Sequence, residues 1–296
     1  MSYSPSYMKK TRWSEWWTAY AFLLPNVLGL SIFVFIPILY AFYVSLHEWN
    51  LLSPKVFAGF DNYIRLMSDR QWWSSLFRTF YFTVVYVPLL FALSLLFAIG
   101  INTLKGKVTG FVRTLFLMPF AVTSVISAII WMFLYDPRRG YINQFLNIFG
   151  IKNQQFLGST SQAMISIVMV ILWINLGYNM TIFLSAIQEI PKDYYEAAKL
   201  DGANPIQVFG NITFPLISET RTFILTVSTI ASFQVLEQIM VMTKGGPAKA
   251  TEVSVLYIYN QSFGMLNMGY GSAMSFVLFL IIFAVSMIQL KTAYRK

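Results

Sequence analysis

The sequence predicts an all-α integral membrane protein with six membrane-spanning helices. Hydrophobic residues make up 57% of the 296 residues and charged residues only 11%, which is too apolar a composition for a water-soluble globule of this length. Six apolar runs are each long enough to cross a hydrocarbon core of about 30 Å at about 1.5 Å per residue. No window alternates polar and apolar residues over several strands, as a membrane barrel would.

The six expected spans belong to one transmembrane domain that covers residues 1–296. They lie at residues 19–46, 79–104, 112–135, 163–187, 216–242 and 270–290. The first apolar run is too long for the h-region of a cleaved signal peptide and has no small-x-small site at its end, so we expect it to be retained. An even number of spans puts both termini on one side, and the basic residues at the ends of the runs favour the cytoplasm.

Composition excludes several classes of function. The chain has no cysteine and one histidine, which leaves no disulfide and almost no material for a metal centre or a catalytic triad. The net charge is +9, yet the basic residues form no patch interleaved with aromatic residues, so we expect no nucleic-acid partner. Residues 100–107 lack the glycine spacing of a phosphate-binding loop, and Val108 stands where Ser or Thr must hold magnesium. Any nucleotide must therefore bind to another chain.

Two expected external loops carry aromatic or apolar residues. The first, residues 47–77, contains several Trp and Tyr residues and suits an interfacial segment. The second, residues 136–162, has Phe145, Leu146 and Ile148 at helical spacing, which predicts a short amphipathic helix. We expect the apolar face of this helix to cover the spans, and the alternative is that it faces a solute-binding protein.

The fourth span contains polar side chains within an apolar helix, at Asn175, Tyr178 and Asn179. An unpaired amide is costly in lipid, so these groups should face protein or a water-filled cavity. Asn175 and Asn179 are four residues apart and share one helix face. Hydrogen bonding between helices and the lining of a solute path both remain open.

The fifth span holds Glu237 well inside an apolar run, together with Ser232 and Gln234. An ionisable residue at that depth is a functional hypothesis in itself. Gln234 precedes Glu237 by three residues, so on a continuous helix the two are near neighbours. The alternative is a structural role, in which Glu237 pairs with a backbone group or an arginine.

A polar island at residues 190–215 separates the fourth and fifth spans, and its sequence predicts two short helices with a sharp corner. Pro191 suits the start of the first helix. Asp201 and Gly202 end it, because glycine tolerates the left-handed conformation that closes many helices. Asn204 is a plausible N-cap for the second helix, with Pro205 at its first position.

The same island offers a docking surface for another protein. Glu196 presents a carboxylate that suits a bidentate arginine, and the small pair Ala197 and Ala198 beside it should let a partner approach the backbone. Pro215 should bar continuation into the next span without a new helix start. We therefore expect this segment to bind a protein and not to perform catalysis.

These residues resemble the EAA loop in the permease subunits of binding-protein-dependent ABC importers, in particular sugar importers of the maltose-transporter type. The matching positions are Glu196, Ala197, Ala198, Asp201, Gly202, Ala203, Phe209, Ile212 and Pro215. The run Thr243-Lys244-Gly245-Gly246-Pro247 and the segment from Phe57 to Tyr63 extend the likeness, which is firmest from Asn175 to Ala273. One departure is Leu236-Glu237, where the family often has Phe-Asp.

The resemblance implies a type I ABC importer permease fold and a place in the plasma (inner) membrane of a bacterium. It implies that the island forms the coupling helices, with Glu196 pairing with a basic group of an ATPase and Gly202 setting the corner. Implied partners are a second permease subunit that brings the total to twelve spans, two ATP-binding subunits that hold ATP and magnesium, an external solute-binding protein and membrane lipid.

The implied activity is carbohydrate import by alternating access, without an enzyme activity or a cofactor in this chain. The residues expected to contact solute are Asn175, Tyr178, Asn179, Ser232, Gln234 and Glu237. One alternative is a glycerol phosphate or a related ester as substrate. Others are an ion-coupled secondary transporter that uses Glu237 as its titrating group, and a membrane-embedded enzyme, for which neither a nucleophile with a base nor a metal cluster is visible.

Overall fold

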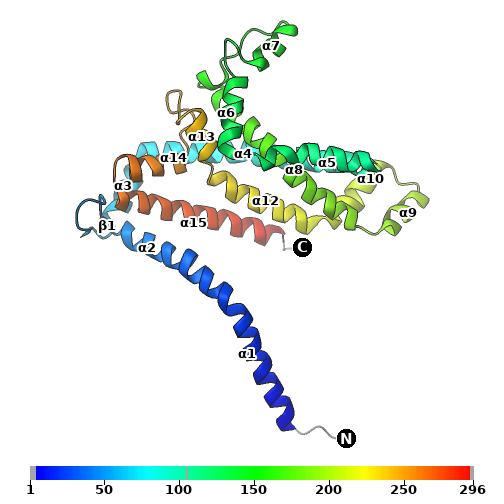
Figure 1. Cartoon of the computed structure of the whole chain (residues 1–296), viewed down its shortest axis with the longest axis horizontal. Helices are drawn as coiled ribbons and strands as arrows, with labels where there is room; N and C mark the ends of the chain where they lie inside the picture. Colours follow the sequence, from blue (N-terminus) through cyan, green and yellow to red (C-terminus); the bar gives the residue numbers. More distant parts are fainter. Residues whose placement is uncertain (1–4, 105, 294–296) are drawn as a thin grey trace. The chain divides into compact units, whose positions relative to one another are not determined.

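The computed structural model describes residues 5–104 and 106–293, and this part of the chain is largely helical (Figure 1). Five helical segments are long and apolar enough to cross a membrane, and the number is six if a bent helix pair is one span. The five segments are Glu15–Ser45, Arg70–Asn102, Ala163–Glu189, Ser218–Met242 and Met268–Ala293. The predicted all-α membrane fold is confirmed, and the assignment of all six spans to one domain stays a prediction.

Two compact units make up the described chain. The first contains the residues up to Ser68 together with Gln261–Phe276, and the second contains Asp69–Asn260 together with the residues from Val277 onward. Helix α15 (Met268–Ala293) begins in the first unit and continues into the second.

The first unit starts with a long apolar helix that the rest of the chain scarcely covers. It consists of α1 (Pro5–Leu30), the π turn η1 (Ser31–Phe35) and α2 (Ile36–Ser45), and only 6% of its most apolar window is buried. The π turn directly precedes Pro37. A proline lacks an N–H and crowds the carbonyl four residues earlier, so a wider turn relieves that conflict without ending the helix.

A short hairpin and a helix follow and pack against each other through Asn62. Strands β1 (His47–Glu48) and β2 (Val56–Phe57) pair antiparallel, and α3 (Asp61–Ser68) comes next. The buried Asn62 side chain donates to the carbonyl oxygens of Ser45 and His47 at 2.9 and 3.0 Å. The hydroxyls of Tyr63 and Ser45 share a hydrogen bond of 2.6 Å. The Asn-Tyr pair therefore anchors this loop to the end of α2.

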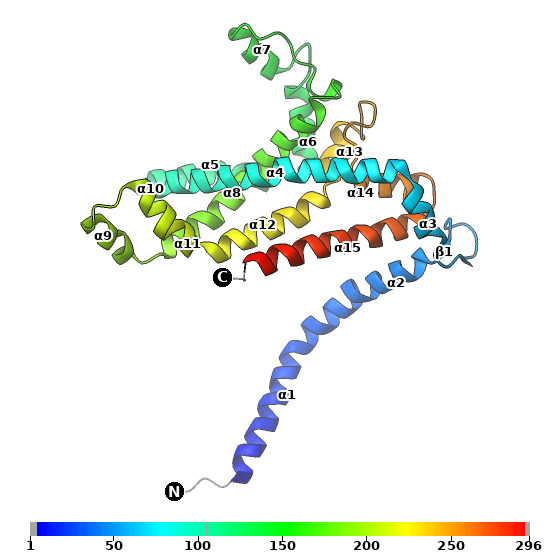
Figure 2. The same ribbon diagram turned by 180° about the vertical axis from the view of Figure 1, so that it is seen from behind.

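Helix α8 (Ala163–Glu189) lies at the centre of the second unit. It packs along α4 (Arg70–Asn102) and α5 (Lys107–Ala121), while α12 (Ser218–Phe233) contacts both α4 and α8. These helices run side by side in Figures 1 and 2. The shorter elements are α6 (Ser124–Leu134), α7 (Tyr141–Ile148), η2 (Phe156–Gly158), α9 (Lys192–Leu200), α10 (Pro205–Val208), η3 (Phe209–Thr213), α11 (Phe214–Leu216), α13 (Glu237–Met242), α14 (Ser254–Tyr259) and η4 (Asn260–Gly264).

Two of the predicted spans are not straight helices. The third is the pair α5 and α6, which bends by 97° at Val122–Thr123. The fifth is interrupted between the end of α12 at Phe233 and the start of α13 at Glu237. Gln234 and Glu237 therefore do not share a continuous helix, and the expectation that they are neighbours on one helical surface is wrong. The segment between them has no glycine or proline, and its Val235 is buried in the core.

Helix α7 forms where the sequence predicts an amphipathic helix, and its Ile142 packs against the core of the spans while two other apolar residues do not. Phe145 and Ile148 are 60% and 77% exposed. Asn143 is buried on the opposite side, where its side chain donates to the Gln154 carbonyl at 3.0 Å and accepts from the Gln154 N–H at 2.9 Å. This pair of bonds fixes the helix with Asn143 inward, so Phe145 and Ile148 do not take the expected orientation against the spans.

A tight loop joins α13 to α14, as the Gly-Gly-Pro run predicts. The Thr251 hydroxyl donates to the Gly246 carbonyl at 2.8 Å and shares a bond of 2.7 Å with the Thr243 hydroxyl. The loop is tied to α4 by a hydrogen bond from the Gln71 side-chain amide to the Glu252 carboxylate. It is thus a fixed part of the second unit.

Candidate functional site

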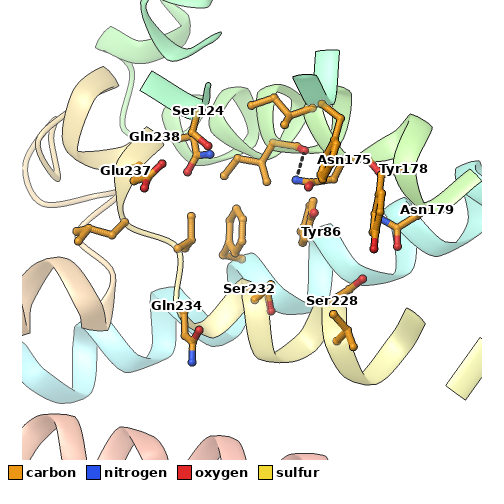
Figure 3. A pocket seen from close by; sticks show the side chains of 18 of the residues that line it. Tyr86, Ser124, Asn175, Tyr178, Asn179, Ser228, Ser232, Gln234, Glu237 and Gln238 are labelled. Atoms are coloured by element: carbon orange, nitrogen blue, oxygen red, sulfur yellow. Dashed lines mark hydrogen bonds between the residues drawn. The ribbon is translucent and has the colours of Figure 1, made fainter. Parts of the chain in front are cut away.

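The second unit contains a cavity of about 520 Å³ lined by α4, α8, α12, α13 and the bend between α5 and α6 (Figure 3). All six residues that the sequence singles out for a solute path line this cavity: Asn175, Tyr178, Asn179, Ser232, Gln234 and Glu237. Figure 3 shows Glu237 and Gln238 beside Ser124 at one end, and Tyr178 and Asn179 at the other. The structure therefore brings them together, while their role in transport stays a prediction.

The two asparagines of α8 are held by their own helix. The Asn175 amide donates to the Ile171 carbonyl at 2.9 Å, and the Asn179 amide donates to the Asn175 carbonyl at 3.0 Å. Bonds of this kind satisfy the amide nitrogen without a partner helix and fix the orientation of the side chain. Both amides are thus placed at the cavity wall in a defined orientation.

Aromatic and hydroxyl groups complete this part of the wall. The rings of Tyr178 and Phe120 are stacked at 4.6 Å with an interplanar angle of 11°, which joins α8 to α5 next to the bend. Ser232 is only 2% exposed, and its hydroxyl lies 2.9 Å from that of Thr83 while donating to the Thr229 carbonyl at 2.7 Å. Ser232 therefore links α12 to α4 and has little capacity left for a solute.

Glu237 differs from the other lining residues because it is a carboxylate that pairs with nothing in the described part of the chain. Its side chain is exposed to the cavity and forms neither a hydrogen bond nor an ion pair with a described residue. The expected alternative, pairing with a backbone group or an arginine, is not formed in the described part of the chain. Glu237 is also the one charged residue among those that line the cavity.

Several lining residues come from elements that sequence analysis did not connect to a site. They are Phe82, Tyr86, Phe120 and Ser124, while Ser228 and Gln238 come from the fifth span. Tyr86 is a polar-tipped residue in an apolar run and could have been noticed, whereas Phe120 is indistinguishable from the many lipid-facing phenylalanines. Ser124 reaches the cavity because the 97° bend turns α6 away from α5.

The polar island folds as predicted into two short helices, α9 and α10. Gly202 has a φ of 75°, Ala203 N–H donates to the Ala198 carbonyl at 3.0 Å and Gly202 N–H donates to the Lys199 carbonyl at 3.2 Å. This is the Schellman arrangement that closes a helix with a left-handed residue. Asn204 then caps α10, exchanging two hydrogen bonds of 2.9 Å with Gln207.

The tip of this loop exposes apolar side chains beside the predicted carboxylate. Leu200 and Ile206 are 89% and 82% exposed, and Glu196 and Ala197 are exposed too. Such side chains at a loop tip are typical of a surface that another protein covers. Ala198 is buried, so it does not offer the low-bulk surface that we expect of the alanine pair; its small side chain permits close packing of α9.

The path from α10 into the next span also differs from the prediction. The helical stretch continues from α10 through the π turn η3 and α11, and Pro215 is the second residue of α11. The chain leaves the helical geometry only at Ile217, and α12 starts at Ser218. Pro215 is tolerated because the wider π turn precedes it, as at Pro37.

Known proteins with similar sequences and structures were found over nearly the whole chain. The family model "Binding-protein-dependent transport system inner membrane component" matches residues 56–294. The trehalose/maltose transport system permease protein MalF of Thermococcus litoralis is 34% identical over 95% of this chain and 95% of its own. The sn-glycerol-3-phosphate transport system permease protein UgpA of Agrobacterium fabrum is 34% identical over 92% of this chain and 93% of its own.

A solved structure shares the fold. It is a bacterial alginate ABC transporter in complex with an alginate pentasaccharide-bound periplasmic protein, with a TM-score of 0.82, 22% identity and coverage of 94% of both chains.

Proposed function

Because the chain belongs to the family of binding-protein-dependent transport system inner membrane components, we propose that it is one permease subunit of an ATP-driven importer for a carbohydrate. The observation that carries this proposal is the cavity of about 520 Å³, whose wall presents amides, hydroxyls and aromatic rings. Sugars are bound by such groups, because they offer many hydroxyls and apolar ring faces.

The proposed partners follow from the surfaces of the chain and from its relatives. A solute-binding protein delivers the carbohydrate, as a periplasmic protein is bound to the alginate transporter. A second permease subunit completes the path, and two ATP-binding subunits hold ATP and magnesium. This chain is not an enzyme in the proposal, since its part is to bind and release solute.

Coupling to ATP is assigned to the α9–α10 loop. Its closed first helix and capped second helix make it a rigid projection, and its exposed leucine and isoleucine suit a cleft in an ATP-binding subunit. Glu196 pairs with a basic group of that subunit. The loop directly joins α8 to α11 and α12, so a pull on it moves two walls of the cavity and switches its access.

Membrane orientation is part of the proposal. With both termini in the cytoplasm of a bacterial plasma (inner) membrane, the α9–α10 loop also faces the cytoplasm, where ATP is found. The distribution of lysine and arginine at the ends of the apolar runs supports this choice.

Copurification and transport test the proposal together. The tagged chain should bring a second permease and an ATP-binding protein from mild-detergent membranes, and the reconstituted complex should take up labelled oligosaccharide only with ATP and a binding protein. Glu196→Ala should abolish uptake while leaving membrane insertion intact. Recovery of the chain alone, active in liposomes without ATP, would instead support an ion-coupled secondary transporter.

A further inference from the structure

The electrostatics of the cavity are dominated by a single group. Among its lining residues, Glu237 carries a charge, and none is a lysine, an arginine or a histidine. The carboxylate has no partner among the described residues. A fixed charge next to low-dielectric walls acts on everything that enters the cavity, because few opposing charges screen it.

We propose that Glu237 is a specificity-determining residue that makes the cavity select carbohydrates by charge. Uncharged and amine-bearing carbohydrates enter, and those with carboxylate, phosphate or sulfate groups are disfavoured. The inference rests on the proposed function and narrows its substrate class. It disfavours the alternative of a glycerol phosphate, whose phosphate would meet an unpaired anion and no cation among the residues of the described chain that line the cavity.

The surrounding side chains support this assignment. Ser124 and Gln238 lie beside Glu237 at the same end of the cavity (Figure 3). Both are neutral, so they can hydrogen-bond a sugar hydroxyl but cannot cancel a charge. At the opposite end, Asn175 and Asn179 are neutral, and each side-chain nitrogen already uses one of its two N–H donors within α8.

The size of the effect follows from Coulomb's law. A unit charge about 6 Å away, at an effective dielectric constant of about 40 for a water-filled cavity, changes the local concentration of a singly charged molecule about tenfold. Cations gain and anions lose by the same factor. The ratio of their concentrations should therefore change by about 100-fold when Glu237 becomes neutral.

The chain has no cysteine, which permits a direct measurement with one introduced thiol. Ser124→Cys places a thiol in the cavity, and Ser53→Cys places one on the exposed hairpin of the first unit as a reference. The rates of modification by a cationic trimethylammonium and an anionic sulfonate methanethiosulfonate are compared in the full importer complex. For the cavity thiol, the rate with the cation is divided by the rate with the anion. This ratio is then normalised by the same ratio measured at the hairpin thiol.

We expect the normalised ratio of cation to anion rates to lie well above one at the cavity thiol. The ratio should fall at least tenfold when Glu237→Gln is added, and it should be kept when Glu237→Asp is added instead. An unchanged ratio in the glutamine variant would overturn the inference. The reagents are not solutes of the importer, so this result does not depend on uptake. The two proposals can also be separated. If the ratio falls in the Glu237→Gln variant but the parent complex transports no carbohydrate, charge selection by Glu237 is supported and the proposed function is refuted.

Discussion

The contact between α5 and α8 at Gly177 gives a quantitative prediction. A Cβ added at Gly177 would lie 1.8 Å from the Phe116 carbonyl oxygen, while ordinary contact begins at 3.4 Å. The backbone of α5 would have to retreat by about 1.6 Å, and overpacking of this kind costs about 1–3 kcal/mol. Gly177→Ala should therefore lower the melting temperature of the purified chain by roughly 2–5 °C.

A matched control lies on α5 itself. Gly110 has no atom within 4 Å of an added Cβ. Gly110→Ala should leave the melting temperature unchanged or raise it, since alanine is favoured over glycine in a helix by about 1 kcal/mol. Thermal unfolding in detergent, followed by tryptophan fluorescence, measures both variants. If Gly177→Ala has the same melting temperature as the parent chain, the close approach of α5 and α8 is refuted.

Three further predictions concern the loops. Asn204→Ala removes the cap of α10, and Gly202→Ala forces an alanine to a φ of 75°. Each variant should destabilise the α9–α10 loop by about 1 kcal/mol. The hydrogen exchange of the loop should become faster, while membrane insertion should not change. Asn143→Ala should expose the α7–η2 segment to trypsin, because the bonds to Gln154 are lost; equal cleavage would contradict their role. Backbone N–H groups of the two following arginines lower the pKa of Asp136. The ionised carboxylate therefore stabilises the turn at pH values above the ordinary carboxyl pKa, and this stabilisation is lost as the pH falls through the lowered pKa. Proteolysis of the turn should rise below about pH 4. The rise should be smaller in Asp136→Asn.

Local chemistry made much of this structure predictable. Long apolar runs define helices because lipid leaves no other way to satisfy the backbone. Gly202 and Asn204 act through bonds to residues within five positions, so their roles as helix end and cap could be inferred from the sequence alone. The six residues predicted for a solute path share one cavity, and they could be chosen because polar groups are conspicuous in apolar runs.

Features that depend on distant contacts could not be inferred in this way. The break before Glu237 has no glycine or proline to announce it in the sequence, and its Val235 packs in the core. Helix α7 turns its polar side inward because Asn143 binds Gln154, eleven residues later. Phe120 reaches the cavity wall only through the bend in its span and its stacking on Tyr178.

The π turns η1 and η3 also fix the rotational phase of the helical segments that directly follow them. Each accommodates one residue more than a regular turn, and a residue corresponds to about 100° around a helix axis. Deleting one residue from Ser31–Phe35 would rotate α2 by that angle and carry the buried Val44 and Ser45 away from their contacts. A deletion in Phe209–Thr213 would likewise rotate α11, the segment that continues the same helix up to Ile217. If a regular helical period is counted through either turn, the residues predicted to face the core after the turn are wrong by one position.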